Sequence, residues 1–284
     1  MSAVAVPAGS RVGAAAGVWA FVKRHVLTVY SILFFLYLLL PIGVVVVFSF
    51  NQPVGKFNYT WNKFTLDNWR YWNGVPGIQG AIVLSLEIAA LASVIATALG
   101  TLIALALVRY GFRGRGVTNL LIFLPLSTPE IVLGASLLTL FLHFTFMPFG
   151  FWTILIAHVM FCISFAVVSV KARLIGFDRH LEEAAMDLGA NEWVTFRKVT
   201  LPLIAPAILA ALLLCFAVSV DDFVVTYFNS GSEVTFPLFV WGAARIGAPP
   251  QVNVIGSAIF IFAVGAMLVN VFVQTRRSKG AVTE

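Results

Sequence analysis

The sequence predicts an all-α integral membrane protein with six transmembrane helices and both termini in the cytoplasm. The first observation behind this is composition: hydrophobic residues make up 60% of the 284 residues, charged residues only 11%, and the mean hydropathy is +0.97. A soluble domain of this length needs a polar surface and cannot hide so much apolar side chain in one core. A bilayer removes that need, because each spanning helix takes about 20 apolar residues.

The second observation is the arrangement of the apolar residues in six long segments, none with the strict alternation of a barrel strand. The first segment follows a Lys-Arg-His sequence that resembles the start of a secretory signal. It is too long for a signal core and no small-residue cleavage site follows it, so we interpret it as a retained helix. The segments run approximately over residues 26–50, 80–108, 118–143, 151–171, 203–228 and 252–274.

The third observation is the distribution of Lys and Arg, which sets the orientation. With the N-terminus in the cytoplasm, the inner segments hold fourteen of these residues and the outer segments four, a strong positive-inside bias. The predicted organisation is a cytoplasmic tail 1–25, a first helix with an outer loop 26–79, a five-helix core 80–275 and a cytoplasmic tail 276–284. The inner set is Arg11, Lys23, Arg24, Arg109, Arg113, Arg115, Lys171, Arg173, Arg179, Arg197, Lys198, Arg276, Arg277 and Lys279; the outer set is Lys56, Lys63, Arg70 and Arg245.

Several function classes are disfavoured. The net charge of +6 does not indicate nucleic acid, because the basic residues form no patch with aromatic neighbours. The sequence has no GxxxxGK[ST] phosphate loop, since residues 111–116 lack the Lys-Ser/Thr pair. His143 and His158 have no matched nucleophile, so we expect packed or interfacial histidines and no enzyme activity. Cys162 and Cys215 lie in apolar stretches, which predicts buried thiols, no disulfide and no metal site.

The longest cytoplasmic loop, residues 171–202, predicts a helix–glycine–helix elbow. Residues 178–188 read as a short helix with Asp178 as its N-cap and acidic residues at its positive end. Gly189 is expected to stop this helix, because glycine accepts the left-handed conformation. Asn191 can cap a second piece through residue 196, and Pro202 is expected to open the next spanning helix. The loop holds five of the twelve acidic residues: Asp178, Glu182, Glu183, Asp187 and Glu192.

One face of this elbow suits contact with another protein. Ala184 and Ala185 allow a close approach to the helix backbone, and Glu182 and Glu183 offer charges to basic residues of that surface. The alternative is an amphipathic surface helix with no partner.

Glu183-Ala184-Ala185, Gly189 and Leu201-Pro202, with the aliphatic Val199, stand at the spacing of the EAA loop of ATP-binding-cassette (ABC) importer permeases. The chain resembles this family over about residues 80–275. The resemblance implies the type I ABC importer permease fold, in a multi-pass protein of the bacterial inner membrane surrounded by lipid. The loop would then be a coupling helix, with Glu183 and Gly189 as its key positions.

The same resemblance implies partners. A second homologous permease subunit, two cytosolic ATPase subunits and an extracytoplasmic substrate-binding protein are expected. ATP and Mg would be bound by the ATPase subunits, so this chain is expected to hold no cofactor of its own.

Four acidic residues lie inside predicted spans, where a charge costs at least a few kcal/mol: Glu87, Glu130, Asp221 and Asp222. No Lys or Arg lies well within a span to neutralise them, so their charge suits a cationic solute. Glu130 lies about 18 Å along the third segment and follows two prolines that break it. Adjacent residues on a helix point about 100° apart, so we expect one of the two aspartates to face the path. A hydrogen-bonding role between helices is the alternative for each acid.

Aromatic residues at the same level, among them Tyr227 and Trp241, can add cation–π contacts to an ammonium group. Residues 219–228 resemble the fifth helix of spermidine/putrescine permeases, which implies a polyamine as the solute. An ABC permease for another small solute such as iron is an alternative. A proton-coupled secondary transporter is less favoured, because it predicts paired broken helices in two inverted halves, and Pro125 and Pro129 have no counterpart.

Overall fold

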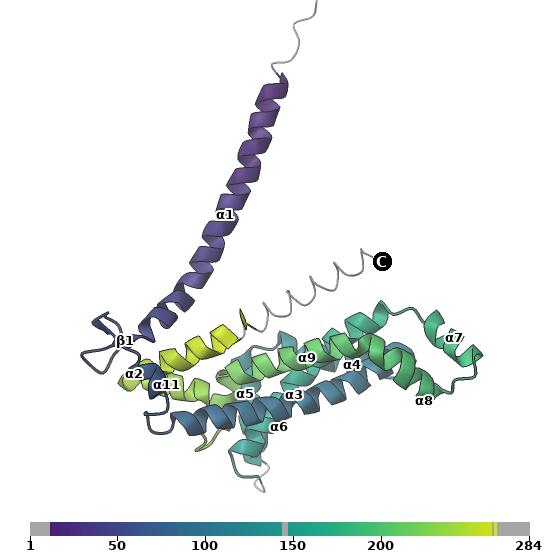
Figure 1. The fold of residues 1–284 in the computed structure, drawn as a ribbon. Helices are drawn as coiled ribbons and strands as arrows, with labels where there is room; N and C mark the ends of the chain where they lie inside the picture. Colours follow the sequence, from purple (N-terminus) through teal and green to yellow (C-terminus); the bar gives the residue numbers. More distant parts are fainter. Residues whose placement is uncertain (1–11, 144–146, 263, 266–284) are drawn as a thin grey trace, which may run out of the picture. The chain divides into compact units, whose positions relative to one another are not determined.

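The computed structural model describes residues 12–143, 147–262, 264 and 265, and this part is mostly helical (Figure 1). The chain divides into two compact units, one of residues up to Gly74 together with those from Gly247 onward, and one of residues Val75–Ile246. The units are described separately below. Residues 1–11 of the predicted N-terminal tail, the last part of the predicted sixth helix and the C-terminal tail 276–284 lie outside the described residues.

The first unit begins with helix α1 (Val12–Phe48), which takes in much of the segment predicted as a cytoplasmic tail, 1–25. A short antiparallel pair follows, β1 (Asn51–Gln52) and β2 (Lys63–Phe64), with Asn51 opposite Phe64. Helix α2 (Asp67–Arg70) lies within the predicted outer loop. The described part of the predicted sixth span is a helix over Pro250–Phe262.

Buried amide side chains hold together the segment that follows α1 in this unit. Asn51 Nδ2 donates to Asn58 Oδ1 at 2.7 Å and to the Thr60 carbonyl at 2.8 Å. Asn68 Nδ2 donates to the carbonyl of Ser49 at 3.0 Å and to that of Asn51 at 2.8 Å. These bonds satisfy backbone groups that would otherwise be buried without partners.

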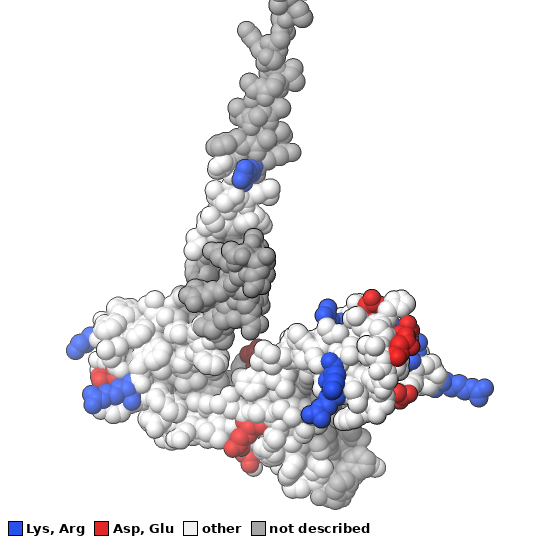
Figure 2. Space-filling model, turned by 45° about the vertical axis from the view of Figure 1, so that its right-hand side comes forward, with Lys and Arg blue, Asp and Glu red and all other residues white. Residues whose placement is uncertain are grey.

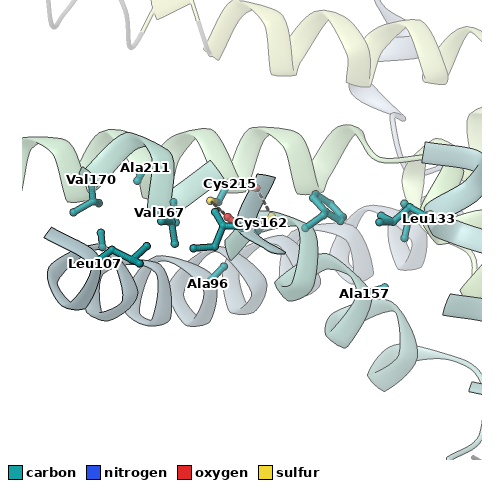
Figure 3. Close-up of a cluster of buried hydrophobic side chains, with 14 of the residues drawn as sticks. Ala96, Leu107, Leu133, Ala157, Cys162, Val167, Val170, Ala211 and Cys215 are labelled. Carbon is teal, nitrogen blue, oxygen red and sulfur yellow. Dashed lines mark hydrogen bonds between the residues drawn. The ribbon is translucent and has the colours of Figure 1, made fainter. Parts of the chain in front are cut away.

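The Val75–Ile246 unit is built around α3 (Ile78–Arg109), α6 (Phe151–Ile175) and α9 (Leu201–Asp221), which pack against one another. Small side chains such as Ala96, Ala166 and Ala211 are fully buried between them. Such residues let helix backbones approach closely, which drives helix association where lipid removes the hydrophobic gain. Figure 3 shows the thiols of Cys162 on α6 and Cys215 on α9 side by side in this core, both free and buried.

The predicted third span, 118–143, is two helices that bend by 111°, α4 (Arg115–Ser127) and α5 (Glu130–His143). Thr128 between them is extended, with φ −84° and ψ 131°. The residue before a proline is disfavoured in the helical region, and Pro129 follows Thr128. Pro129 therefore lies at the break, whereas Pro125 lies inside α4, two residues before its end.

The predicted fifth span, 203–228, differs from the structure at both ends. Helix α8 (Glu192–Thr195) continues through a π-helical turn (Phe196–Thr200) into α9, so Pro202 lies inside a helix that starts at Glu192. In the π turn the Leu201 N–H donates to the Phe196 carbonyl five residues back. A wider turn at this point accommodates a proline that a regular α-helix tolerates poorly in its interior.

At its other end, α9 stops at Asp221 and a separate helix, α10 (Val224–Asn229), follows an extended Asp222 with φ −64° and ψ 120°. Helix α11 (Phe236–Ile246) completes the unit, and the short α7 (His180–Asp187) lies between α6 and α8. The second half of the chain therefore contains a broken helix that prolines did not indicate.

Four helical stretches of the described residues are long and apolar enough to cross a membrane: Arg24–Phe48, Ile78–Arg109, Phe151–Ile175 and Glu192–Asp221. The α4–α5 pair gives a fifth if the bent pair is one span. An all-α membrane protein is thus confirmed, and the six-helix count stays a prediction.

The close contact of α3 and α6 gives a testable expectation. A Cβ at Gly100 would lie 2.5 Å from the Ala166 Cβ and 3.1 Å from the Val167 nitrogen. We expect Gly100→Ala to lower the melting temperature of the purified protein, since overpacking costs about 1–3 kcal/mol. Gly80 on the same helix has open space around its Cβ position, so Gly80→Ala is the matched control and is expected to keep or raise stability. Equal melting temperatures for the two variants would contradict the packing described here.

Candidate functional site

A cavity of about 740 Å³ lies where the two broken helices of the Val75–Ile246 unit meet. Its wall includes the break between α4 and α5, the break between α9 and α10, and two phenylalanines of α6. Irregular backbone at membrane depth is tolerated where it lines a cavity, and both breaks line this one. The polar and aromatic lining residues are Ser127, Thr128, Glu130, Phe161, Phe165, Asp221, Asp222 and Phe223.

Close packing holds the two breaks next to each other. A Cβ at Gly134 on α5 would lie 2.7 Å from the Phe228 ring of α10, so only glycine allows this approach. Asn229 Nδ2 donates to the Val225 carbonyl at 2.8 Å and to the Gly134 carbonyl at 3.4 Å. Thr153 of α6 donates to the Asn229 carbonyl at 2.7 Å. The short α10 is therefore fixed to α5 and to α6 at once.

Asp222 is engaged by the chain itself. Its side chain is 7% exposed, and its Oδ2 accepts from the Thr226 N–H at 2.8 Å and from the Thr226 hydroxyl at 2.7 Å. His158, 2% exposed, places Nε2 at 3.3 Å from the same oxygen. These partners already use much of the accepting capacity of one carboxylate oxygen, so Asp222 is well satisfied without a solute.

Asp221 has the opposite environment. It is the last residue of α9 and is exposed, at the helix end where the macrodipole is negative and disfavours an anion. Glu130, in the first turn of α5, is also exposed. No basic residue lines the cavity. Two carboxylates thus face a shared space without a basic partner in its wall, which suits a cation.

The remaining predicted path residues lie outside the cavity lining. Glu87 is exposed on α3. Tyr227 and Trp241 reach the cavity through Phe223, whose ring centroid is 5.7 Å from that of Tyr227 and 5.1 Å from that of Trp241. Trp241 lies on α11 and not in a loop, and the Arg245 guanidinium carbon lies 4.5 Å from its ring centroid. The face predicted to receive an ammonium group therefore contacts a cation of the chain.

The predicted helix–glycine–helix elbow is confirmed, except for the N-cap of its first helix. Asp178 Oδ1 accepts from the His180 N–H at 3.0 Å, but α7 begins at His180 and its N-cap residue is Arg179, not Asp178. Gly189 has φ +89°, the left-handed conformation predicted for it. Asn191 Oδ1 accepts from the Val194 N–H at 2.9 Å and caps α8.

The two glutamates of the elbow differ from each other, contrary to the expectation that both offer charge to another surface. Glu182 is 14% exposed and forms an ion pair with Arg109 at the end of α3, and it accepts a hydrogen bond from the Thr200 hydroxyl in the π turn. Glu183 is 61% exposed and lies 3.0 Å from His180 Nδ1. Arg109, read from sequence as a topology signal, thus attaches α7 to α3.

The exposed surface of α7, α8 and the turn between them combines charged with apolar side chains. In Figure 2 the acidic and basic atoms of this unit gather around the end that holds α7 and α8, and most of its other visible surface is white. Leu188 is 90% exposed and Trp193 is 67% exposed, while Ala184 and Gly189 are also exposed. Exposed apolar residues within a charged region are typical of a protein contact site.

Residues 96–277 match the family described as the inner membrane component of binding-protein-dependent transport systems. This match covers more than half of the chain, so the chain belongs to this family of membrane permease components and is a multi-pass inner membrane protein.

Named relatives place it more finely. It is 36% identical to the spermidine/putrescine transport system permease protein PotC of Escherichia coli K12, over 86% of this chain and 92% of that protein. It is 37% identical to the PotC protein of Haemophilus influenzae, over 85% and 93%. It is 39% identical to the putrescine transport system permease protein PotI of E. coli K12, over 79% and 82%.

Solved structures agree on the fold. A bacterial ABC transporter that imports the acidic polysaccharide alginate matches 95% of this chain and 99% of its own, with a TM-score of 0.63 and 19% identity. An amino acid ABC transporter matches 75% and 99%, with a TM-score of 0.55 and 18% identity. The Val75–Ile246 unit is thus part of an ABC importer permease fold.

The contact of Arg109 with Glu182 gives a second expectation. Arg109→Ala and Glu182→Ala should each lower the melting temperature, because hydrogen bonds to charged groups contribute about 1.5–3 kcal/mol. Exchange of the two residues, Arg109→Glu with Glu182→Arg, should recover part of the loss. His180→Ala is the control, since that side chain is 86% exposed. An exchange variant no more stable than either alanine variant would contradict a direct ionic contact.

Proposed function

We propose that this chain is a permease subunit of an ATP-driven importer of polyamines, and that the cavity between its two broken helices is part of the path. The observation that carries this proposal is the pair of exposed carboxylates, Glu130 and Asp221, in a cavity wall without a basic residue. A polyamine is a flexible chain with several ammonium groups, so separated carboxylates and aromatic rings match its chemistry. The names of the PotC and PotI relatives, which are permeases for spermidine/putrescine and putrescine transport, support the same solute class.

The proposed assembly has a second homologous permease, two cytosolic ATPase subunits that bind ATP and Mg, and an extracytoplasmic binding protein. Six spanning helices with both termini in the cytoplasm complete this proposal, supported by the positive-inside count. The exposed face of α7, with Glu183 and Ala184, would dock on an ATPase subunit.

The structure suggests how movement at that dock reaches the cavity. Helix Glu192–Asp221 is continuous for 30 residues, about 45 Å at 1.5 Å per residue, and joins the cytoplasmic loop to the cavity wall. The Arg109–Glu182–Thr200 contacts attach α7 both to α3 and to the π turn at the base of this helix. A displacement of α7 would therefore move two of the three central helices together.

The solute proposal is tested by neutralising each acid in the assembled importer. Glu130→Gln and Asp221→Asn should each raise the KM for labelled putrescine or spermidine by about tenfold, the loss of roughly one charge-assisted contact of 1.4 kcal/mol. Glu87→Gln is the matched control, since Glu87 is exposed on α3 outside the cavity and is expected to leave KM unchanged.

The outcome separates the alternatives. If wild-type importer takes up no polyamine but takes up another small solute such as iron, the permease assignment stands and the polyamine assignment is wrong. If uptake continues without ATP and follows a proton gradient, the ATP-driven mechanism is wrong.

Coupling is tested at the exposed face of α7. Glu183→Arg reverses a charge at the proposed dock, and Gly189→Asp puts a side chain where φ is +89°. Both variants should insert and fold, yet ATP hydrolysis in the assembled importer should no longer respond to loaded binding protein, and uptake should fall at least tenfold. Asp187→Arg, an equal charge reversal on the same helix outside the motif, is expected to have a smaller effect. If uptake falls equally in all three variants, the effect comes from the changed charge of the loop and not from the motif positions.

A further inference from the structure

We propose that His158 is a positioning residue that holds the break between α9 and α10 and thereby presents Asp221, rather than Asp222, to the cavity. This inference rests on the proposed role of the cavity, but its geometric part is independent of the solute. The adjacent aspartates cannot be distinguished by sequence position alone, and the contacts of His158 distinguish them.

His158 lies on α6 and bridges both sides of the break. Its Nδ1 lies 2.7 Å from the Ser219 hydroxyl on α9, and its Nε2 lies 2.9 Å from the Thr226 hydroxyl on α10. Both hydroxyl partners and the imidazole are buried, with Ser219 4% and Thr226 0% exposed. One side chain thus connects the end of one helix to the start of the next.

The proton positions in this cluster follow from the donors that are present. The Thr226 hydroxyl has one proton and gives it to Asp222 Oδ2, so the contact with His158 requires a proton on Nε2. That N–H points at Thr226 Oγ1 and at Asp222 Oδ2, which lies 3.3 Å away. The imidazole therefore orients the Thr226 hydroxyl and the Asp222 carboxylate together.

Asp222 in turn shapes the backbone. Its carboxylate accepts from the N–H groups of Val225 and Thr226, in the first turn of α10. These bonds replace the helical partners that the N–H groups would have if α9 continued, so they favour a stop after Asp221. Asp221 is left as the last residue of α9, exposed at the cavity wall.

Transport alone cannot separate this role from general stability, so accessibility of position 221 is the measurement. Asp221→Cys places a thiol at the cavity wall, and Cys162 and Cys215 are both 0% exposed and should not react. A cationic methanethiosulfonate reagent should label this variant quickly in the assembled importer in membrane vesicles. Adding His158→Ala or Thr226→Val should slow labelling at least tenfold, whereas Thr226→Ser, which keeps the hydroxyl, should restore most of the rate.

Each outcome of the labelling experiment either supports or overturns the proposal. Unchanged labelling in the His158→Ala and Thr226→Val backgrounds overturns the proposal, and so does an equal slowing by Thr226→Val and Thr226→Ser. If His158→Ala does not accumulate in the membrane, the Thr226 pair decides alone, because valine matches threonine in shape and serine matches it in chemistry.

Uptake kinetics give an independent measurement. Because His158 is proposed to act through Asp221, the His158→Ala/Asp221→Asn double variant should have the same KM for putrescine as Asp221→Asn alone. Multiplying KM effects would show that His158 acts elsewhere and overturn the proposal. If wild-type importer does not transport polyamines, the proposed solute fails while the labelling experiment still decides the role of His158.

Discussion

The structure depends on one constraint: a backbone N–H or C=O in hydrocarbon needs a partner, and each one left without a partner costs several kcal/mol. Two helices of the Val75–Ile246 unit are broken, and side chains next to each break form hydrogen bonds with backbone groups of the helix ends. Ser127 and Thr128 donate their hydroxyls to carbonyls four residues back, at 3.0 and 2.7 Å. At the other break the Asp222 carboxylate accepts from two N–H groups of α10. Side-chain hydrogen bonds therefore reinforce the helix ends at both breaks, and the cavity lies between them.

The same constraint explains why adjacent aspartates differ. A carboxylate is a good partner for the free N–H groups at the start of a helix. The Asp222 carboxylate is therefore already bonded to the first turn of α10. Asp221 precedes it at the negative end of α9, where no free backbone N–H is available to bond its carboxylate. In the proposed function, the preference for a positive solute comes from Asp221, at an unfavourable helix end, together with the exposed Glu130 at the facing break.

Local chemistry explains what sequence predicted well. Pro125 and Pro129 indicated the first break, and Gly189 and Asn191 indicated the elbow, because each acts through the backbone within a few residues. The second break was not predicted, since no proline marks it and His158, which contacts both of its sides, lies 64 positions before Asp222. Glu182 was expected to offer its charge to another protein for the same reason, because its partner Arg109 is 73 residues away in the sequence. Local sequence patterns do not indicate which residues far apart in the chain come into contact.

Helix Glu192–Asp221 connects the loop of residues 171–202 to the cavity wall, and this links the two functions proposed for the chain. Proline at position 202 would ordinarily interrupt a helix that begins at Glu192, and the π turn before it keeps the helix continuous. That turn also carries Thr200, whose hydroxyl reaches Glu182 of α7. The position where the helix departs from regular geometry is therefore where α7 is attached. A rigid helix with its attachment at one end and Asp221 at the other can transmit a displacement that a flexible linker would absorb.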